Sequence, residues 1–110
     1  MQWPENREAI WRYMPRGIRI SIRRTTWQDH ICLGHPELHN CLGDVLKAIE
    51  RPEAVYQSGN TRYSYTYSVK RGSFIMLIYK VNRNLGWVLT AYTVQNPYVE
   101  VEGLNRVWPI

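Results

Sequence analysis

The sequence predicts an α+β protein in which N-terminal helices pack on a roughly four-stranded antiparallel sheet. Apolar residues recur at helical spacing in the first half of the chain, and they alternate with polar residues after Pro52. Turn signals separate the alternating segments. With 110 residues, 45% hydrophobic and 21% charged, the chain can bury one modest core. We therefore predict a single domain over residues 1–110.

The first 25 residues are predicted to form an Arg-rich helix and a strand. Pro4 suits the first turn of a helix, and apolar residues follow at helical spacing, so we expect a helix over residues 4–14. In residues 18–23 isoleucine alternates with arginine and serine. This alternation predicts a strand whose outer face is basic.

Two helices are expected between Thr26 and Pro52. Thr26 can cap a short helix that ends at Gly34. Leucine, valine and isoleucine at spacings of three and four then predict a longer helix over residues 36–50. We expect this longer helix to cover one face of the sheet and to leave the other face partly free.

The rest of the chain reads as β structure. Four alternating or apolar segments, each bounded by a turn, predict an antiparallel meander. The predicted strands span residues 54–58, 62–69, 73–81 and 87–94. The C-terminal tail, residues 95–110, contributes at most one short edge strand over residues 99–101.

The charge of the chain points to a polyanionic partner. It has 14 Lys and Arg against 9 Asp and Glu, and eleven of the cations are arginine, whose planar guanidinium binds phosphate bidentately. Strand 62–69 interleaves tyrosine with arginine and hydroxyl residues, which suits base stacking beside phosphate neutralisation. RNA is the predicted partner. Two alternatives stay open: a basic composition serves solubility, and a tyrosine row packs within the fold.

Other classes of site and location are less favoured by the sequence. No apolar run approaches a membrane span and no secretory signal is readable, so we expect a cytoplasmic protein without membrane association. Cys32 and Cys41 are expected to be reduced thiols rather than a bridge. His35 and His39 lie near them, but Pro36 interrupts the helical spacing and no metal-ligand pattern matches. We predict no metal and no other cofactor.

An ordered set of short motifs spans residues 26–94. It consists of Trp27-x-x-His-Ile-x-x-x-His-Pro-Glu-Leu, an amphipathic helix ending Ala-Ile-x-x-Pro52, an Arg-Tyr strand, an apolar strand and Val-Leu-Thr-Ala-Tyr92. In this order the motifs resemble the phage-associated barnase–EndoU–colicin–RelE-like (BECR) nuclease domains. The resemblance implies a small α+β, metal-independent ribonuclease of toxin or effector type. It also implies an acidic antitoxin or immunity protein as a partner.

The resemblance assigns candidate catalytic residues by position. His30 matches the histidine of the His-Ile motif, Thr90 and Tyr92 match the Thr-Ala-Tyr strand, and Arg62 matches a basic position at a strand start. Gly34 departs from the family pattern, because a basic residue is common at that point.

Metal-independent RNA cleavage needs a base for the 2′-hydroxyl, donors for the crowded phosphorane and an acid for the departing 5′-oxygen. We assign His30 as the base or acid, Arg62 as the phosphate-neutralising group, and Thr90 and Tyr92 as donors. The predicted RNA-binding residues are Arg19, Arg23, Arg24, Tyr63, Tyr65 and Lys80. The alternatives are a non-catalytic nucleic-acid-binding module and a protein-interaction component of a toxin–antitoxin pair.

Overall fold

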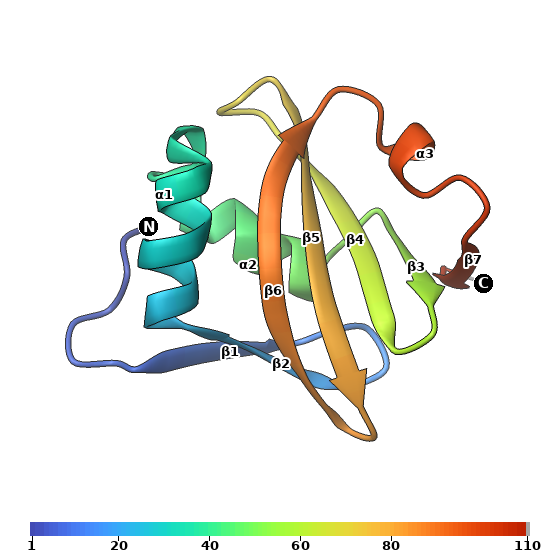
Figure 1. Cartoon of the computed structure of the whole chain (residues 1–110), viewed down its shortest axis with the longest axis horizontal. Coiled ribbons are helices and arrows are strands. Elements are labelled where there is room, and N and C mark those ends of the chain that lie inside the picture. The colour runs from blue at the N-terminus through green and yellow to red at the C-terminus, as the bar shows by residue number, and fades with distance from the viewer. Residues whose placement is uncertain (110) are drawn as a thin grey trace.

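A seven-stranded mixed sheet forms the centre of the computed structural model, which describes residues 1–109 (Figure 1). The strands lie side by side in the order β1-β2-β6-β5-β4-β3-β7. Their bounds are β1 Ala9–Tyr13, β2 Arg19–Arg23, β3 Ala54–Ser58, β4 Thr61–Ser68, β5 Ser73–Asn82, β6 Leu85–Val94 and β7 Asn105–Trp108. The predicted fold class is therefore wrong, because the sheet has seven strands rather than four and one of its pairs is parallel.

The predicted helix over residues 4–14 is also wrong, because this segment contains strand β1. All five residues of β1 pair antiparallel with β2, from Ala9 opposite Arg23 to Tyr13 opposite Arg19. Asn6 has a φ of 61°, which breaks any helix that starts at Pro4. The apolar spacing that predicted a helix instead places Ile10 on the buried side of a strand.

A short parallel seam joins the β1–β2 hairpin to the rest of the sheet. It consists of three residue pairs between β2 and β6, with Ile20 opposite Gly86 at its centre. A Cβ atom on Gly86 would lie 2.5 Å from Cδ1 of Ile20 and 2.6 Å from the carbonyl oxygen of Lys80. The hydroxyl of Ser21 donates to the carbonyl oxygen of Gly86 at 3.3 Å. Only glycine allows this close approach.

Strands β3 to β6 form the predicted antiparallel meander. The ladder between β5 and β6 contains one β-bulge: Ile78 faces Thr90, and Tyr79 faces Val88. Leu89 is therefore the extra residue of β6, without a partner on β5. The regular alternation of side chains along β6 is interrupted at Leu89 and continues on either side of it.

The C-terminal tail differs from the prediction. The expected edge strand over residues 99–101 is wrong, because helix α3 (Pro97–Glu100) and its cap Val101 occupy this segment. The Asn96 side chain caps α3 by accepting a hydrogen bond from the Tyr98 amide at 3.1 Å. The edge strand is instead β7, which pairs antiparallel with β3. Ile110, the last residue of the predicted tail, lies outside the described residues.

Helical segments cover one face of the sheet. The segment after β2 forms a π-helical turn, η1 (Thr26–Ile31), and then α1 (Cys32–Gly34). The predicted helix over residues 36–50 is split into a 3-10 turn, η2 (Pro36–Leu38), and helix α2 (Leu42–Glu50). No helix within residues 1–109 is long and apolar enough to cross a bilayer.

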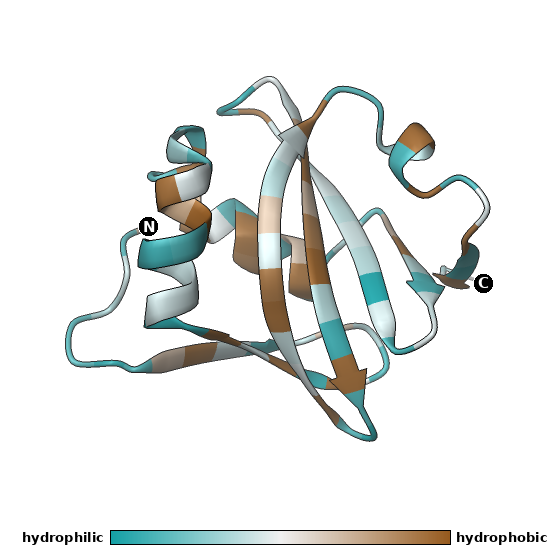
Figure 2. Cartoon of the chain, in the orientation of Figure 1, coloured by the Kyte–Doolittle hydropathy of each residue, from teal (hydrophilic) through white to brown (hydrophobic). Residues whose placement is uncertain are grey.

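Helix α2 defines the helix-covered face of the sheet, and it lies behind β5 and β6 in Figure 1. The Ser64 hydroxyl donates to the carbonyl oxygen of Ala48, and the Ser68 hydroxyl donates to Asp44 at 2.8 Å. Figure 2 shows apolar residues on α2 and along β5, beside the more polar β4. The fully buried side chains of this core include Ile20, Ile22, Ile31, Leu42, Val45, Ile49, Leu77 and Tyr79.

The opposite face, which we call the outer face, carries the alternate side chains of every strand. Helix α3 and the tail cover its β3–β4 half, where Ala54, Tyr65, Met76 and Val101 form a second buried cluster. Its other half, over β1, β2 and the N-terminal part of β6, carries the exposed side chains of the N-terminal hairpin. This half is where the candidate site lies.

Candidate nucleic-acid interface

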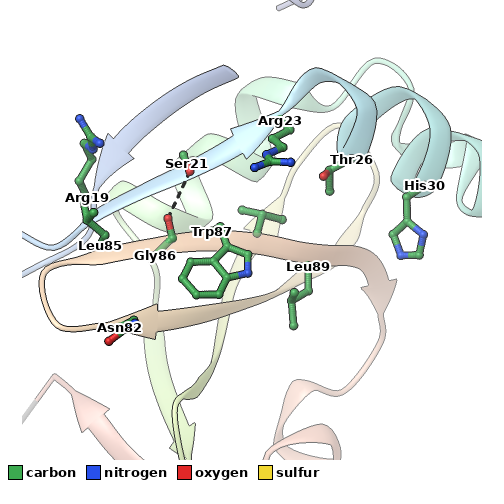
Figure 3. Close-up of a pocket in the computed structure, with 11 residues that line it drawn as sticks. Arg19, Ser21, Arg23, Thr26, His30, Asn82, Leu85, Gly86, Trp87 and Leu89 are labelled. Atoms are coloured by element: carbon green, nitrogen blue, oxygen red, sulfur yellow. Dashed lines mark hydrogen bonds between the residues drawn. The ribbon is translucent and has the colours of Figure 1, made fainter. Parts of the chain in front are cut away.

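A pocket of about 640 Å³ opens on the outer face beside the parallel seam (Figure 3). We call it the seam pocket. The polar and aromatic side chains that line it include Arg19, Ser21 and Arg23 from β2, Thr26 and His30 from η1, and Trp87 from β6. Its volume lies within the range of small-molecule and nucleotide sites, which is roughly 300–1,000 Å³.

The alternation of β2 explains why two arginines reach this pocket. Ile20 and Ile22 are fully buried on the helix-covered face, so Arg19, Ser21 and Arg23 point to the outer face. The Cα atoms of Arg19 and Arg23 are roughly 13 Å apart, given the rise of about 3.3 Å per strand residue.

The parallel pairing places an aromatic ring between these two arginines. Trp87 lies opposite Ser21, midway between Arg19 and Arg23 along β2. In Figure 3 the indole of Trp87 faces the viewer, with Arg23 and His30 toward one end of the pocket and Arg19 toward the other. A planar ring flanked by cations is the arrangement that stacks a base and neutralises its neighbouring phosphates.

The positive charge of the two seam-pocket arginines is not balanced by acidic side chains, because there is no Asp or Glu among the described residues that line the pocket. Within residues 1–109 the one contact between a basic and an acidic side chain within 4.0 Å joins His35 Nδ1 to Glu37 Oε1 at 3.6 Å, so neither pocket arginine has a carboxylate within that distance. Arg19 lies over the ring of Trp11 at 5.7 Å, a cation–π contact that holds its guanidinium on this face. The pocket therefore attracts anions.

Exposed aromatic rings extend the surface beyond the pocket. Trp11 and Tyr13 of β1 are 45% and 52% exposed, and Trp87 is 43% exposed. The first two rings meet edge to face, with their centroids 5.4 Å apart. These large rings are solvent-accessible on the outer face, where unstacked bases could contact them.

The structure separates the four predicted catalytic residues. His30 is exposed and lines the seam pocket. Thr90 and Tyr92 lie on the outer face, opposite Ile78 and Met76, but they do not line this pocket. Arg62 lies on the helix-covered face, because it pairs with Tyr79 and alternates with the outer-face tyrosines. The Nε atom of Arg62 is buried without a hydrogen-bond partner.

Tyr92 instead lies beside a different histidine, His35. Their ring centroids are 5.9 Å apart with an angle of 34° between the planes. Glu37 links this histidine to β6, because it accepts a hydrogen bond from the Thr93 hydroxyl at 3.4 Å. Burial, followed by the charge of Glu100, raises the pKa of Tyr92 to about 12. The phenol of this His35–Tyr92 cluster is therefore a proton-bearing donor at neutral pH.

The predicted RNA-binding cations have different surroundings. Arg19 and Arg23 line the seam pocket. Arg24 does not line it, and its Nε atom is buried without a hydrogen-bond partner. Lys80 lies on the outer face opposite Trp87, where its Nζ donates to Oδ1 of Asn60 at 3.3 Å.

The predicted RNA-binding tyrosines belong to the covered half of the outer face. Tyr65 is only 4% exposed and stacks on Tyr56 with centroids 6.5 Å apart. Burial, followed by the nearby Tyr56, raises its pKa to about 12. Tyr63 packs against the same cluster. Tyr65 therefore serves packing in this chain, and its ring is not available to a base.

Several residues of the site, among them Trp87, Thr26 and His35, were not selected as binding or catalytic residues from the sequence. Trp87 was missed because its position between two arginines depends on the β2–β6 pairing. His35 was considered only as a metal ligand, although the His-Pro-Glu motif marked it. Within residues 1–109 no group of three or more His, Cys, Asp and Glu side chains could hold a metal ion, and Cys32 and Cys41 are free thiols.

Comparison with known proteins adds no identification. No family model, no curated protein and no solved structure matches the chain. The resemblance to the BECR nuclease domains therefore stays a prediction from the order of its motifs, and the functional argument depends on the geometry of the outer face.

Proposed function

We propose that this protein binds single-stranded RNA across the outer face of its sheet, with the seam pocket as the anchor. One observation carries the proposal: Arg19, Arg23, His30 and Trp87 line the same pocket, and none of the described lining residues is acidic. The arginines would neutralise phosphates and the indole would stack a base.

The form of the surface favours single strands over a duplex. Trp11, Tyr13 and Trp87 expose their rings on one side of the sheet. A ring contributes through stacking only when the base is unpaired and turned outward, whereas duplex RNA hides its base faces and offers phosphates and 2′-hydroxyls. We therefore expect a preference for unstructured RNA.

The test is a set of RNA-binding titrations at several salt concentrations. Replacing Arg19 and Arg23 together by glutamine should weaken binding about tenfold or more and reduce the salt slope by about one to two. The matched control replaces Arg51 and Arg71, which lie on the helix side of the molecule. Equal losses in both double variants would show that net charge, rather than this face, binds RNA.

A second candidate function, metal-independent ribonuclease activity, has specific support in two histidines. His30 shares the seam pocket with Arg23, and His35 lies beside the proton-bearing Tyr92. One imidazole would take the proton of a 2′-hydroxyl, whose oxygen attacks phosphorus. The 5′-oxygen would leave with a proton from an acid, and a 2′,3′-cyclic phosphate would remain. Arg62, on the helix-covered face, has no part in this candidate.

Incubation of RNA with the protein in EDTA, followed by analysis of the new ends, tests this candidate. We expect cyclic phosphate ends, and a loss of about 10²-fold or more in rate in whichever of His30→Ala and His35→Ala removes the reacting imidazole. If both variants cleave as fast as the parent protein, the activity does not belong to these histidines. If no cleavage occurs while RNA still binds, the chain is a binding module.

A further inference from the structure

We propose that the seam pocket recognises a terminal phosphomonoester, at the end of an RNA chain or on a free nucleotide, in preference to an internal phosphodiester. This inference depends on the proposed binding of RNA by the outer face. It follows from Arg23 and Thr26, which lie at one end of the pocket next to Trp87, with His30 further along the η1 turn.

The first argument is the balance of charge. A phosphomonoester carries a charge of about −1.5 to −2 near neutral pH and presents three acceptor oxygens. An internal phosphodiester carries a single negative charge. The end of the seam pocket that holds Arg23 offers a guanidinium, a hydroxyl and an imidazole, and none of the described lining residues is acidic. A dianion matches this set better than a monoanion does.

The second argument is the kind of donors at the Arg23 end. The guanidinium of Arg23 is a planar fork that can contact two phosphate oxygens at once. Thr26, the first residue of the η1 turn, adds a hydroxyl near Arg23, and His30 adds a ring nitrogen further along the same turn (Figure 3). Two oxygens of a terminal phosphate can contact the Arg23 fork while the third remains for the Thr26 hydroxyl, whereas an esterified oxygen of an internal phosphate accepts more weakly.

The third argument is the position of the stacking ring. Trp87 is level with Ser21, and Arg23 lies two residues further along β2, a separation of roughly 7 Å along the strand. One nucleotide can place its base on the indole and its phosphate at Arg23. Arg19, on the other side of the indole, is then free to contact the next phosphate of an RNA chain. The pocket thus provides separate places for a base, its terminal phosphate and the chain that follows.

The test compares one short single-stranded oligonucleotide with a 5′-phosphate, with a 3′-phosphate or with hydroxyls at both ends. At low salt we expect one phosphorylated form to bind at least about tenfold more tightly than the unphosphorylated form. Arg23→Gln should abolish this preference, and Arg23→Lys, which keeps the charge but not the fork, should retain part of it. The control Arg51→Gln should leave the preference unchanged. Circular dichroism checks that the exposed-site variants fold.

The outcomes separate this inference from the proposed function. Equal affinity for all three oligonucleotides would overturn end recognition and leave RNA binding standing, whereas no binding of any of them would overturn both. Competition by a nucleoside monophosphate, with the nucleoside alone as control, identifies the source of the ligand. Competition as strong as that of the phosphorylated RNA points to free nucleotides, and weaker competition points to RNA ends.

Discussion

The two halves of the outer face use the same residue types for different purposes. Over β3 and β4, helix α3 and the tail cover the sheet, and Tyr65 packs against Tyr56, Phe74 and Tyr98. Over β1, β2 and the N-terminal part of β6 no such cover is present among the described residues, and Trp11 and Trp87 remain exposed. Whether an aromatic residue belongs to a core or to a binding surface is thus decided by the segment that lies above it.

The two halves of the outer face also differ in the sign of their charged side chains. In the covered half, the carboxylates of Glu53 and Glu100 lie close enough to raise the pKa values of Tyr65 and Tyr92. In the open half, Arg19 and Arg23 have no carboxylate partner among the described residues. An anionic chain would therefore be attracted to the open half. The predictions below test this division.

The largest expected effect is on stability, in the covered half. Tyr65→Ala removes a ring from a residue that is only 4% exposed, and deletions of buried aromatic rings cost about 3–5 kcal/mol. Urea unfolding should show this loss in the free energy of unfolding. Tyr67→Ala is the matched control from the same strand and face, because Tyr67 is 42% exposed, and its cost should be clearly smaller. Equal costs would show that coverage does not distinguish the two positions.

The next effect concerns the seam that supports the open half. Gly86→Ala places a methyl group against Ile20 and the Lys80 carbonyl, so we expect a loss of about 1–3 kcal/mol in the free energy of unfolding together with weaker RNA binding. Gly34→Ala is the control, because nothing lies within 4 Å of the position that its methyl group would occupy and its φ is not left-handed. A neutral Gly86→Ala would mean that β2 does not depend on this close approach.

A smaller effect is expected on affinity when the open half loses its central ring. Trp87→Leu should weaken binding of single-stranded RNA about tenfold, because stacking contributes about 1–3 kcal/mol per base. Its free energy of unfolding should change little, since the side chain is 43% exposed. Trp87→Phe keeps a stacking face and should recover part of the affinity. Unchanged affinity in Trp87→Leu would remove the indole from the interface.

The smallest effect appears at alkaline pH. The pKa of Tyr65 is about 12 in the folded protein and about 10 in an unfolded chain. Between these values the unfolded chain binds fewer protons, so stability present below about pH 10 is lost as the pH rises toward 12, by about 1 kcal/mol at pH 11. Unfolding titrations should show that Tyr65→Phe removes this part of the slope and that Tyr13→Phe, an exposed control, does not.

The strands of the meander were predictable because period-two alternation is a local signal. The N-terminal segment was not, since Ile10 and Met14 fit both a helical stripe and a strand that runs into a turn. The parallel pairing of β2 with β6 joins residues about 65 positions apart, and no local pattern encodes it. Sequence reasoning therefore found the meander but missed both the β1–β2 hairpin and its parallel pairing with β6.

The site was predictable to a similar extent. Arg19, Arg23 and His30 were each selected, and they line one pocket because η1 follows β2 almost directly. Arg62 could not have joined the tyrosines, because alternation already placed it on the opposite face from Tyr63. What the sequence did not reveal is which of those two faces the helix α2 would cover.

The β2–β6 seam is short, and this determines which part of the sheet opens first. Three residue pairs hold the hairpin to β6, so thermal fluctuations should detach it more readily than they disrupt the long β5–β6 ladder, and amide protons of β2 should exchange with deuterium first. A ligand that touches both Arg23 and Trp87 bridges the two sides of this joint. Binding of such a ligand would slow the exchange of the β2 amide protons. Ligand binding and the local stability of this part of the sheet are therefore coupled.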